Sequence, residues 1–308
     1  MPIFPLLACL SIAATPTAPA ATVPADESPA QATLHADRSA IWPGGTINLA
    51  VNFKIQKGWH LYWRGQNDSG FSPGIDWTLP AGCKVGEIRW PAPHRHIAPG
   101  DLLDHIYEGD LTLIVPFTAD KTVKPGTPLA IAGAAKWLVC KEACLPGDAT
   151  LSLALPVVAA ETEAKASPSA AKIAAAQKLI PQPAPATVVA KVDGSTLILN
   201  APGAESITFL PDEAGAFVVK PLVSCTAKGD TLRIPLDLDR RGDKQPTAAI
   251  GILEAKFPAA KTADATKPEA AKPSDPGKTP ESTPRTVAYS INVPLRARAP
   301  AEPGATKP

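Results

Sequence analysis

The sequence predicts an all-β protein, in which a β-sandwich domain is followed by a helical connector and a second, small β-rich domain. The 308 residues include 36 prolines and 21 glycines but few aromatic residues, a composition that favours short strands joined by turns over helices. From Ile47 to Ile55, apolar residues occupy alternate positions, which is the period of a strand with one buried face. A chain of this length suits about two domains.

The first domain is expected at residues 31–158. About eight short strands separated by turn-forming residues are typical of a β-sandwich. We interpret the stretch around His94 and His96 as a loop, because prolines flank it. The expected strands are residues 31–36, 47–55, the start of 58–70, 75–79, 84–90, 111–118, 129–138 and 150–157.

A linker at residues 159–185 is expected to contain one helix. Ser167 and Pro168 suit an N-cap and a first helical position, and the helix formers of residues 170–180 end at Pro181. Expected strands of a second domain at residues 186–296 follow at 188–192, 196–199, 207–210, 217–219, 232–236, 248–253 and 287–293.

Two segments near the C-terminus are too polar to order themselves. Residues 256–285 consist almost entirely of Pro, Ala, Lys, Thr, Glu, Asp and Ser, which cannot bury enough apolar surface to fold. We predict a disordered loop there and a disordered tail at residues 297–308.

Residues 1–20 are expected to be a signal peptide. An apolar stretch from Ile3 to Ala14 precedes Ala18-Pro19-Ala20, a cleavage-site pattern, although the segment has no Lys or Arg. Residues 21–30 form a Pro/Ala-rich lead-in that we expect to be disordered. Leu6-Leu7-Ala8-Cys9 is only faintly similar to a lipoprotein box, and no lipid anchor at Cys9 is expected. The sequence therefore indicates export.

Charge and hydropathy exclude several function classes. Beyond the signal, no uncharged apolar run approaches the roughly 20 residues that span a bilayer, so the mature chain is expected to be soluble. The formal net charge of +1 gives no electrostatic reason to expect nucleic acid or an anionic membrane as a partner.

Cys140 and Cys144 are the candidate chemical centre. They lie four residues apart between two expected strands, a separation that allows a disulfide in an oxidising compartment. Trp137 offers an apolar wall, Lys141 a cation that favours thiolate and Glu142 an anion that opposes it, so the direction of any shift in thiol pKa stays open.

The cysteines also allow a structural or a metal-binding role. A bond across four residues closes a small loop and stabilises less than a bond across a long one, which favours a redox switch over a structural staple. Cys83 and Cys225 are interpreted as small buried hydrophobes, although four cysteines allow three pairings. A zinc or copper site would need some of His60, His94, His96 and His105, which we interpret instead as solvated, so no metal is expected.

Six segments in register resemble the N-terminal domain of DsbD-like and ScsB-like thiol:disulfide interchange proteins, over roughly residues 31–158. They are Gly58–Trp63, Asp68–Gly70, Ile75–Trp77, Trp90–Pro93, Tyr107–Gly109 and Trp137–Pro146. The resemblance implies an immunoglobulin-like sandwich in the periplasm. It also implies that the linker helix and second β-rich region correspond to an extension seen in the ScsB-like branch.

The resemblance further implies thiol:disulfide interchange, an activity like that of a protein-disulfide reductase, with no cofactor. Cys140 and Cys144 would pass electrons between a membrane reductase and periplasmic thiol-disulfide proteins, with Cys144 facing the partner and Cys140 resolving. An aromatic-bearing loop shields the cysteines in the family, and Tyr62, Phe71 or Tyr107 are the candidates here. Because this sequence has neither the family's transmembrane spans nor a C-x-x-C motif, electrons are expected to come from another protein.

The rival hypothesis is a binding module that does no chemistry. In that reading, the sandwich holds a component of cytochrome c maturation or copper handling and its disulfide is static. The sequence therefore leaves open whether the protein is an enzyme, and the reducibility of the Cys140–Cys144 bond would separate the two hypotheses.

Overall fold

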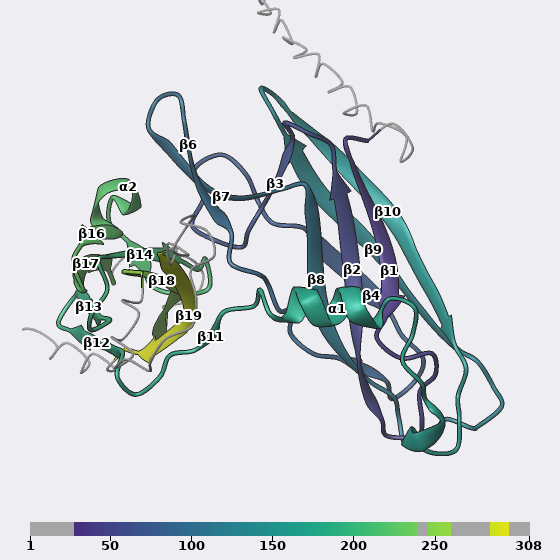
Figure 1. The fold of residues 1–308 in the computed structure, drawn as a ribbon. Helices are drawn as coiled ribbons and strands as arrows, with labels where there is room; N and C mark the ends of the chain where they lie inside the picture. Colours follow the sequence, from purple (N-terminus) through teal and green to yellow (C-terminus); the bar gives the residue numbers. More distant parts are fainter. Residues whose placement is uncertain (1–27, 239–245, 260–283, 296–308) are drawn as a thin grey trace, which may run out of the picture.

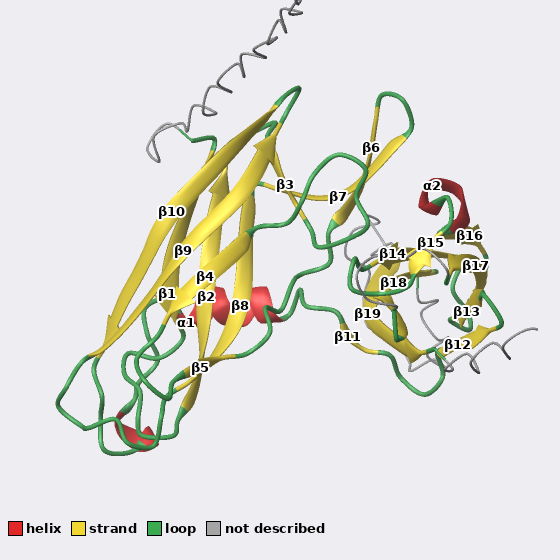
Figure 2. Cartoon of the chain, turned by 180° about the vertical axis from the view of Figure 1, so that it is seen from behind, coloured by secondary structure: helices red, strands yellow, loops and turns green. Residues whose placement is uncertain are grey.

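The computed structural model describes residues 28–238, 246–259 and 284–295, which form two β-rich domains joined through a short helix (Figures 1 and 2). The prediction of an all-β fold is confirmed. The predicted signal peptide, the disordered tail and most of the disordered loop and lead-in lie outside the described residues. The end of the lead-in is packed, however: Ser28 is buried and Ala30 already begins the first strand.

The first domain is a sandwich of two sheets (Figure 2). One sheet has the order β1-β2-β8-β5, with β1 at Ala30–Ala36, β2 at Thr46–Ile55, β8 at Asp110–Thr118 and β5 at Lys84–Val85. The other has the order β10-β9-β3-β7-β6, with β10 at Cys144–Leu155, β9 at Leu129–Cys140, β3 at His60–Tyr62, β7 at Leu102–Glu108 and β6 at His94–Ala98. A short strand, β4 at Gly74–Thr78, also pairs with β9.

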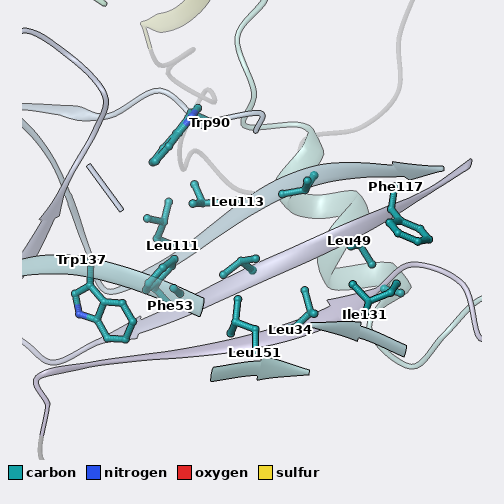
Figure 3. Close-up of a cluster of buried hydrophobic side chains, with 14 of the residues drawn as sticks. Leu34, Leu49, Phe53, Trp90, Leu111, Leu113, Phe117, Ile131, Trp137 and Leu151 are labelled. Atoms are coloured by element: carbon teal, nitrogen blue, oxygen red, sulfur yellow. The ribbon is translucent and has the colours of Figure 1, made fainter. Parts of the chain in front are cut away.

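The core of the sandwich follows from the alternation of apolar residues. Leu49, Val51 and Phe53 are fully buried on one face of β2, because successive side chains of a strand point to opposite faces. The Phe53 ring meets the Trp137 indole edge to face, with ring centroids 5.3 Å apart. Figure 3 shows Leu49, Phe53 and Trp137 within the cluster of buried side chains.

The hairpin of β6 and β7 corrects the prediction of a loop around His94 and His96. The two strands pair from His94 opposite Ile106 to Ala98 opposite Leu102. β7 shows no alternation in its burial, since five consecutive residues from Leu103 to Tyr107 are buried. Other parts of the chain cover both of its faces, so the period-two signal is absent. The strand expected at residues 84–90, in contrast, ends at Val85.

The linker contains a 3₁₀ turn at Glu161–Glu163 and the helix α1 at Ala170–Gln177. Ile173 and Ala176 of α1 pack against Ala50 and Ile114 of the first sheet. The helix starts two residues after Pro168, the predicted first position. The Ser167 hydroxyl accepts from the Ser169 amide, as an N-cap side chain does, and donates to the Ala36 carbonyl. Its apolar contacts fasten the linker to the outer face of the sandwich.

The second domain has its own core between two sheets, which includes Leu199, Phe209, Ile234 and Leu253. One sheet has the order β11-β19-β18-β14-β16, with bounds Gln182–Pro183, Arg285–Pro294, Ala248–Phe257, Ser206–Pro211 and Thr226–Lys228. The other has the order β12-β13-β17-β15, at Val189–Asp193, Thr196–Asn200, Thr231–Asp237 and Phe217–Val218, and the short helix α2 spans Pro221–Ser224.

The ends of the segment predicted to be disordered, at residues 256–285, belong to strands. Lys256 pairs with Thr286 and Phe257 with Arg285 across β18 and β19. The Arg285 guanidinium also lies over the Phe257 ring, 5.7 Å from its centroid. Sheet pairing therefore orders residues whose composition alone indicates disorder.

Candidate functional site

The candidate site lies at the end of the β9–β10 hairpin. Both strands are 12 residues long, and their register places Cys140 directly opposite Cys144. The two are joined by a disulfide, with Cα atoms 4.1 Å apart. Lys141, Glu142 and Ala143 form the exposed tip, where the Lys141 amide donates to the Ala143 carbonyl at 3.2 Å. Antiparallel pairing thus places the two cysteines side by side.

The two cysteines differ in their access to solvent. Cys140 is only 2% exposed and packs with Tyr62, Ile106 and Leu138 on the outer face of the sheet. Cys144 is exposed. A protein that approaches the hairpin therefore meets Cys144 before Cys140.

Tyr62 is the side chain that reaches the disulfide. Its hydroxyl oxygen lies 3.7 Å from Cys144 Sγ, 3.3 Å from His60 Nε2 and 3.3 Å from Ser69 Oγ. Burial raises the pKa of the Tyr62 hydroxyl above its usual value, while the hydrogen bond to Ser69 opposes that rise. Tyr62 therefore stays a neutral hydrogen-bonding group beside the sulfur.

A loop at residues 66–72 covers Tyr62 and is tied to β7. The buried Asp104 carboxylate accepts hydrogen bonds from the Asp68 and Ser69 amides, both at 3.0 Å, and from the Ser69 hydroxyl. Gly70 lies directly on the tyrosine ring, since a Cβ added there would come within 2.2 Å of it. The loop can pass this close only because Gly70 has no side chain.

His60 lies within hydrogen-bonding distance of the same Tyr62 hydroxyl. It is 9% exposed and pairs in register with Cys140. Its ring centroid is 5.6 Å from that of His96 on β6. Burial lowers the pKa of His60, the charge of His96 lowers it further, and Asp104 and Glu108 oppose the shift. The imidazole is therefore neutral near pH 7.

A comparison with protein families matches residues 30–156 to the family described as thiol:disulfide interchange protein DsbD, N-terminal. Residues 30–156 form a DsbD-type N-terminal domain. This family accounts for the first sandwich and its cysteine-bearing hairpin, and the second domain lies outside the matched residues. The predicted resemblance is thereby confirmed for the first domain.

A solved structure extends the comparison of folds beyond the first domain. The N-terminal periplasmic domain of ScsB from Proteus mirabilis is 17% identical, with a TM-score of 0.52 over 89% of this chain and 96% of that one. The N-terminal domain of DsbD from Neisseria meningitidis in its reduced form is 13% identical, with a TM-score of 0.26 over 39% and 84%. The ScsB structure supports the immunoglobulin-like fold. No curated protein matches the sequence significantly.

Two side chains predicted at the site of the DsbD-type domain lie elsewhere. Trp137 is in the sandwich core against Phe53, three positions from Cys140 and thus on the opposite face of β9. Tyr107 also faces the core, where it stacks on Trp90, and its hydroxyl donates to the Pro91 carbonyl at 2.7 Å. Strand alternation separates it from Tyr62, which pairs with its neighbour Ile106.

The remaining candidates lie at the hairpin tip or in the loop that covers Tyr62. Lys141 and Glu142 are at the exposed hairpin tip, and the Lys141 side chain lies over Gly58. Phe71 follows Gly70 in the loop that covers Tyr62, and its ring is 59% exposed. The shielding role suggested for Phe71 stays a prediction.

The histidines do not assemble around a metal. Among the described residues, no group of three or more His, Cys, Asp or Glu side chains is arranged to hold an ion. His60 and His96 face each other, while His105 packs against Trp63 with ring centroids 5.8 Å apart. The predicted solvated state is wrong for His60 and His105, which are 9% and 0% exposed.

Cys83 and Cys225 are both free and buried, each in the core of its own domain. Burial raises the pKa of the Cys225 thiol to about 12, so that thiol remains protonated. In the described part of the chain, no helix combines the length and hydropathy needed to span a bilayer.

Sequence reasoning missed Ser69 and Asp104 as parts of the site. Their contact joins a loop to β7 across 35 residues of chain, and β7 itself gave no strand signal. His60 was named only as a candidate metal ligand. The position of His60 two residues before Tyr62 places both on one face of β3, and that spacing is the signal that could have found it.

Proposed function

We propose that the DsbD-type domain exchanges disulfides with partner proteins in the periplasm, passing electrons between a membrane reductase and periplasmic thiol proteins. The observation that carries the proposal is the asymmetric disulfide at the open end of the hairpin, with Cys144 exposed and Cys140 2% exposed. Membership of the family and the predicted signal peptide support the compartment.

The exchange needs no group beyond the two cysteines and a partner. In the reduced domain, the Cys144 thiolate attacks one sulfur of a partner disulfide, which breaks that bond and forms a mixed disulfide. The Cys140 thiolate then attacks the Cys144 sulfur, restores the internal bond and releases the partner with two thiols. Two electrons pass to the partner, and a membrane reductase with a dithiol returns the domain to its reduced form.

The location of the bond is consistent with repeated opening and closing. The β9–β10 ladder continues from Cys140 and Cys144 to Leu129 and Leu155, so the strands remain paired when the bond is broken. Breaking it leaves the sandwich core intact, because the core lies on the opposite face of β9.

A trapping experiment tests the proposal. Cys140→Ser should leave Cys144 able to capture a partner as a persistent mixed disulfide, because the thiol that resolves the intermediate is gone. Cys144→Ser should trap much less, since Cys140 is buried. Periplasmic extract from cells expressing each variant, compared on reducing and non-reducing gels, gives the measurement. Capture by Cys140 alone would reverse the roles, and capture by neither would count against exchange.

The rival function is a binding module with a static disulfide. Equilibration of the pure protein with glutathione or thioredoxin buffers, followed by thiol counting at Cys140 and Cys144, separates the two. Titration of the bond within the range of these buffers supports exchange. A bond that stays closed throughout supports the binding module.

A further inference from the structure

We propose that Tyr62 and His60 form a proton relay that takes the proton from the Cys144 thiol when it becomes the attacking thiolate. The inference rests on the proposed exchange function, and it adds two residues to the chemistry of the cysteines. In this assignment Tyr62 contacts the reacting sulfur and His60 acts through Tyr62.

The geometry provides one continuous path. Cys144 Sγ lies 3.7 Å from the Tyr62 hydroxyl oxygen, a hydrogen-bonding distance for sulfur, and the same oxygen lies 3.3 Å from His60 Nε2. His60 and Tyr62 are two residues apart on β3 and therefore face the same side of the sheet. Both are buried, at 9% and 1% exposure, so bulk water does not replace the path.

The Tyr62 hydroxyl proton has two acceptors, His60 Nε2 and Ser69 Oγ, each 3.3 Å from the hydroxyl oxygen. The Ser69 hydroxyl donates to the Asp104 carboxylate, which can only accept. Ser69 can then only accept from Tyr62, so the tyrosine turns its one hydrogen toward either Ser69 or His60. The relay uses the orientation toward His60: in the dithiol form, the Cys144 S–H donates to the tyrosine oxygen, and the tyrosine O–H donates to Nε2 of a neutral His60 whose proton is on Nδ1.

Each proton that moves along this path has a donor and an acceptor. The Cys144 proton moves to the Tyr62 oxygen while the Tyr62 proton moves to His60 Nε2, which gives a thiolate, an unchanged tyrosine and an imidazolium. Tyr62 then donates its hydrogen to the thiolate, and His60 donates to Tyr62. When the thiolate attacks a partner disulfide, the leaving partner thiolate takes up a proton and His60 returns to its neutral state.

The charged surroundings of His60 fit a base that is neutral at rest. The titratable groups that face it are His96 on β6 and Asp104 and Glu108 on β7. Burial and His96 keep the ring neutral, and the two carboxylates stabilise it once it has accepted the proton. The imidazolium and the thiolate that form together also attract each other.

The test measures thiol acidity directly and needs no partner. In a Cys140→Ser background, the rate of iodoacetamide alkylation at Cys144 is followed from pH 5 to pH 10 by peptide mass mapping, which separates it from the buried Cys83 and Cys225. Tyr62→Phe keeps the ring under Gly70 but removes the hydroxyl. It should raise the pH midpoint by about one unit and slow alkylation at pH 7 about tenfold, the effect of one lost hydrogen bond to a charged group.

A second variant addresses the base. His60→Gln keeps a polar side chain but cannot take up the proton, and it should also slow alkylation at pH 7. If circular dichroism shows that Tyr62→Phe is unfolded, His60→Gln alone tests the relay. Tyr107→Phe, a buried tyrosine bonded to Pro91, and His35→Gln, an exposed histidine, are matched controls that should behave like the parent.

Each outcome decides the relay. A shift in both Tyr62→Phe and His60→Gln but not in the controls supports it. A parent-like pH midpoint in either variant, or an equal shift in Tyr107→Phe, overturns it. Because alkylation needs no partner, a shifted midpoint with no partner trapped in extract would retain the relay and reject the exchange function.

Discussion

His105 shows how burial decides the charge of a single side chain. It is 0% exposed on β7, where it packs against Trp63 and its Nδ1 lies 3.2 Å from Asn67 Oδ1. Burial, together with the charge of Arg95, lowers the pKa of its imidazole from 6.5 to about 4, against the opposing effect of Asp104. The folded protein therefore holds this ring neutral over a pH range in which the unfolded chain would protonate it.

This burial predicts a dependence of stability on pH. A folded-state pKa below the unfolded one contributes stability that is complete above pH 6.5 and is lost as the pH falls toward 4. The loss should reach about 3 kcal/mol. Chemical denaturation of wild type and His105→Gln at pH 7.5 and pH 4 measures it, because the carboxylates that also titrate are common to both proteins. If wild type and His105→Gln lose the same unfolding free energy between pH 7.5 and pH 4, His105 is not responsible for the loss.

At the scale of the element, α1 illustrates that a short helix can depend entirely on packing. It is 8 residues long, too short to be stable alone in water. Ile173, 2% exposed, fixes it against Ala50 and Ile114 of the first sheet. The linker is thereby part of the first domain's outer surface.

We predict that Ile173→Ala lowers the free energy of unfolding by roughly 2–5 kcal/mol, through lost apolar burial and the cavity that remains. Leu179→Ala, at a side chain 64% exposed, is the matched control and should change the value by less than about 0.5 kcal/mol. Urea denaturation of the three proteins gives the comparison. Equal stability of Ile173→Ala and wild type would mean that α1 is not held by this contact.

The elements predictable from sequence were those with one buried face. The alternation of β2 and the apolar runs of β9 and β18 gave their positions. β7, buried on both faces, and the two-residue β11 have no period to detect. The ends of the loop after β18 were misplaced because pairing with β19 overrides local composition.

The site was likewise predictable only where local sequence determines it. Cys140 and Cys144 were found because they are close in the sequence. Trp137 was expected to form an apolar wall beside the cysteines, although its odd offset from Cys140 already places it on the opposite face of the strand. Asp104 and Ser69 could not be found, since their contact depends on how β7 packs under the loop.

At the scale of the whole molecule, the second domain holds the segment that leads into the covering loop. Arg64 Nε lies 2.9 Å from the buried Asp212 carboxylate. The Gln66 side chain donates to the Ala216 carbonyl and accepts from the Val218 amide, both at 3.0 Å. Gln66 begins the loop over Tyr62, and the amide of Asp68, two residues further on, donates to the Asp104 carboxylate. The second domain therefore helps to fix the loop at the cysteine site.

We predict that Gln66→Ala loosens this connection, because it removes the side-chain hydrogen bonds to the backbone of Asp212, Ala216 and Val218 at a cost of about 1–3 kcal/mol. Amide hydrogen exchange should become faster at Val218 and in residues 67–72. Gln56→Ala, at an exposed side chain, is the matched control. Unchanged exchange in residues 67–72 would indicate that the loop is fixed by β7 alone.

The register of Cys140 opposite Cys144 also governs how long a partner stays attached. In the proposed exchange, the hairpin holds the resolving thiol beside the mixed disulfide, and well-oriented intramolecular groups reach effective molarities on the order of 10⁵ M or more. No thiol free in solution competes with such a neighbour. The lifetime of the covalent complex is then a property of the hairpin and not of the docking affinity. A brief, weak encounter is sufficient, and one hairpin can serve partners whose surfaces have little in common.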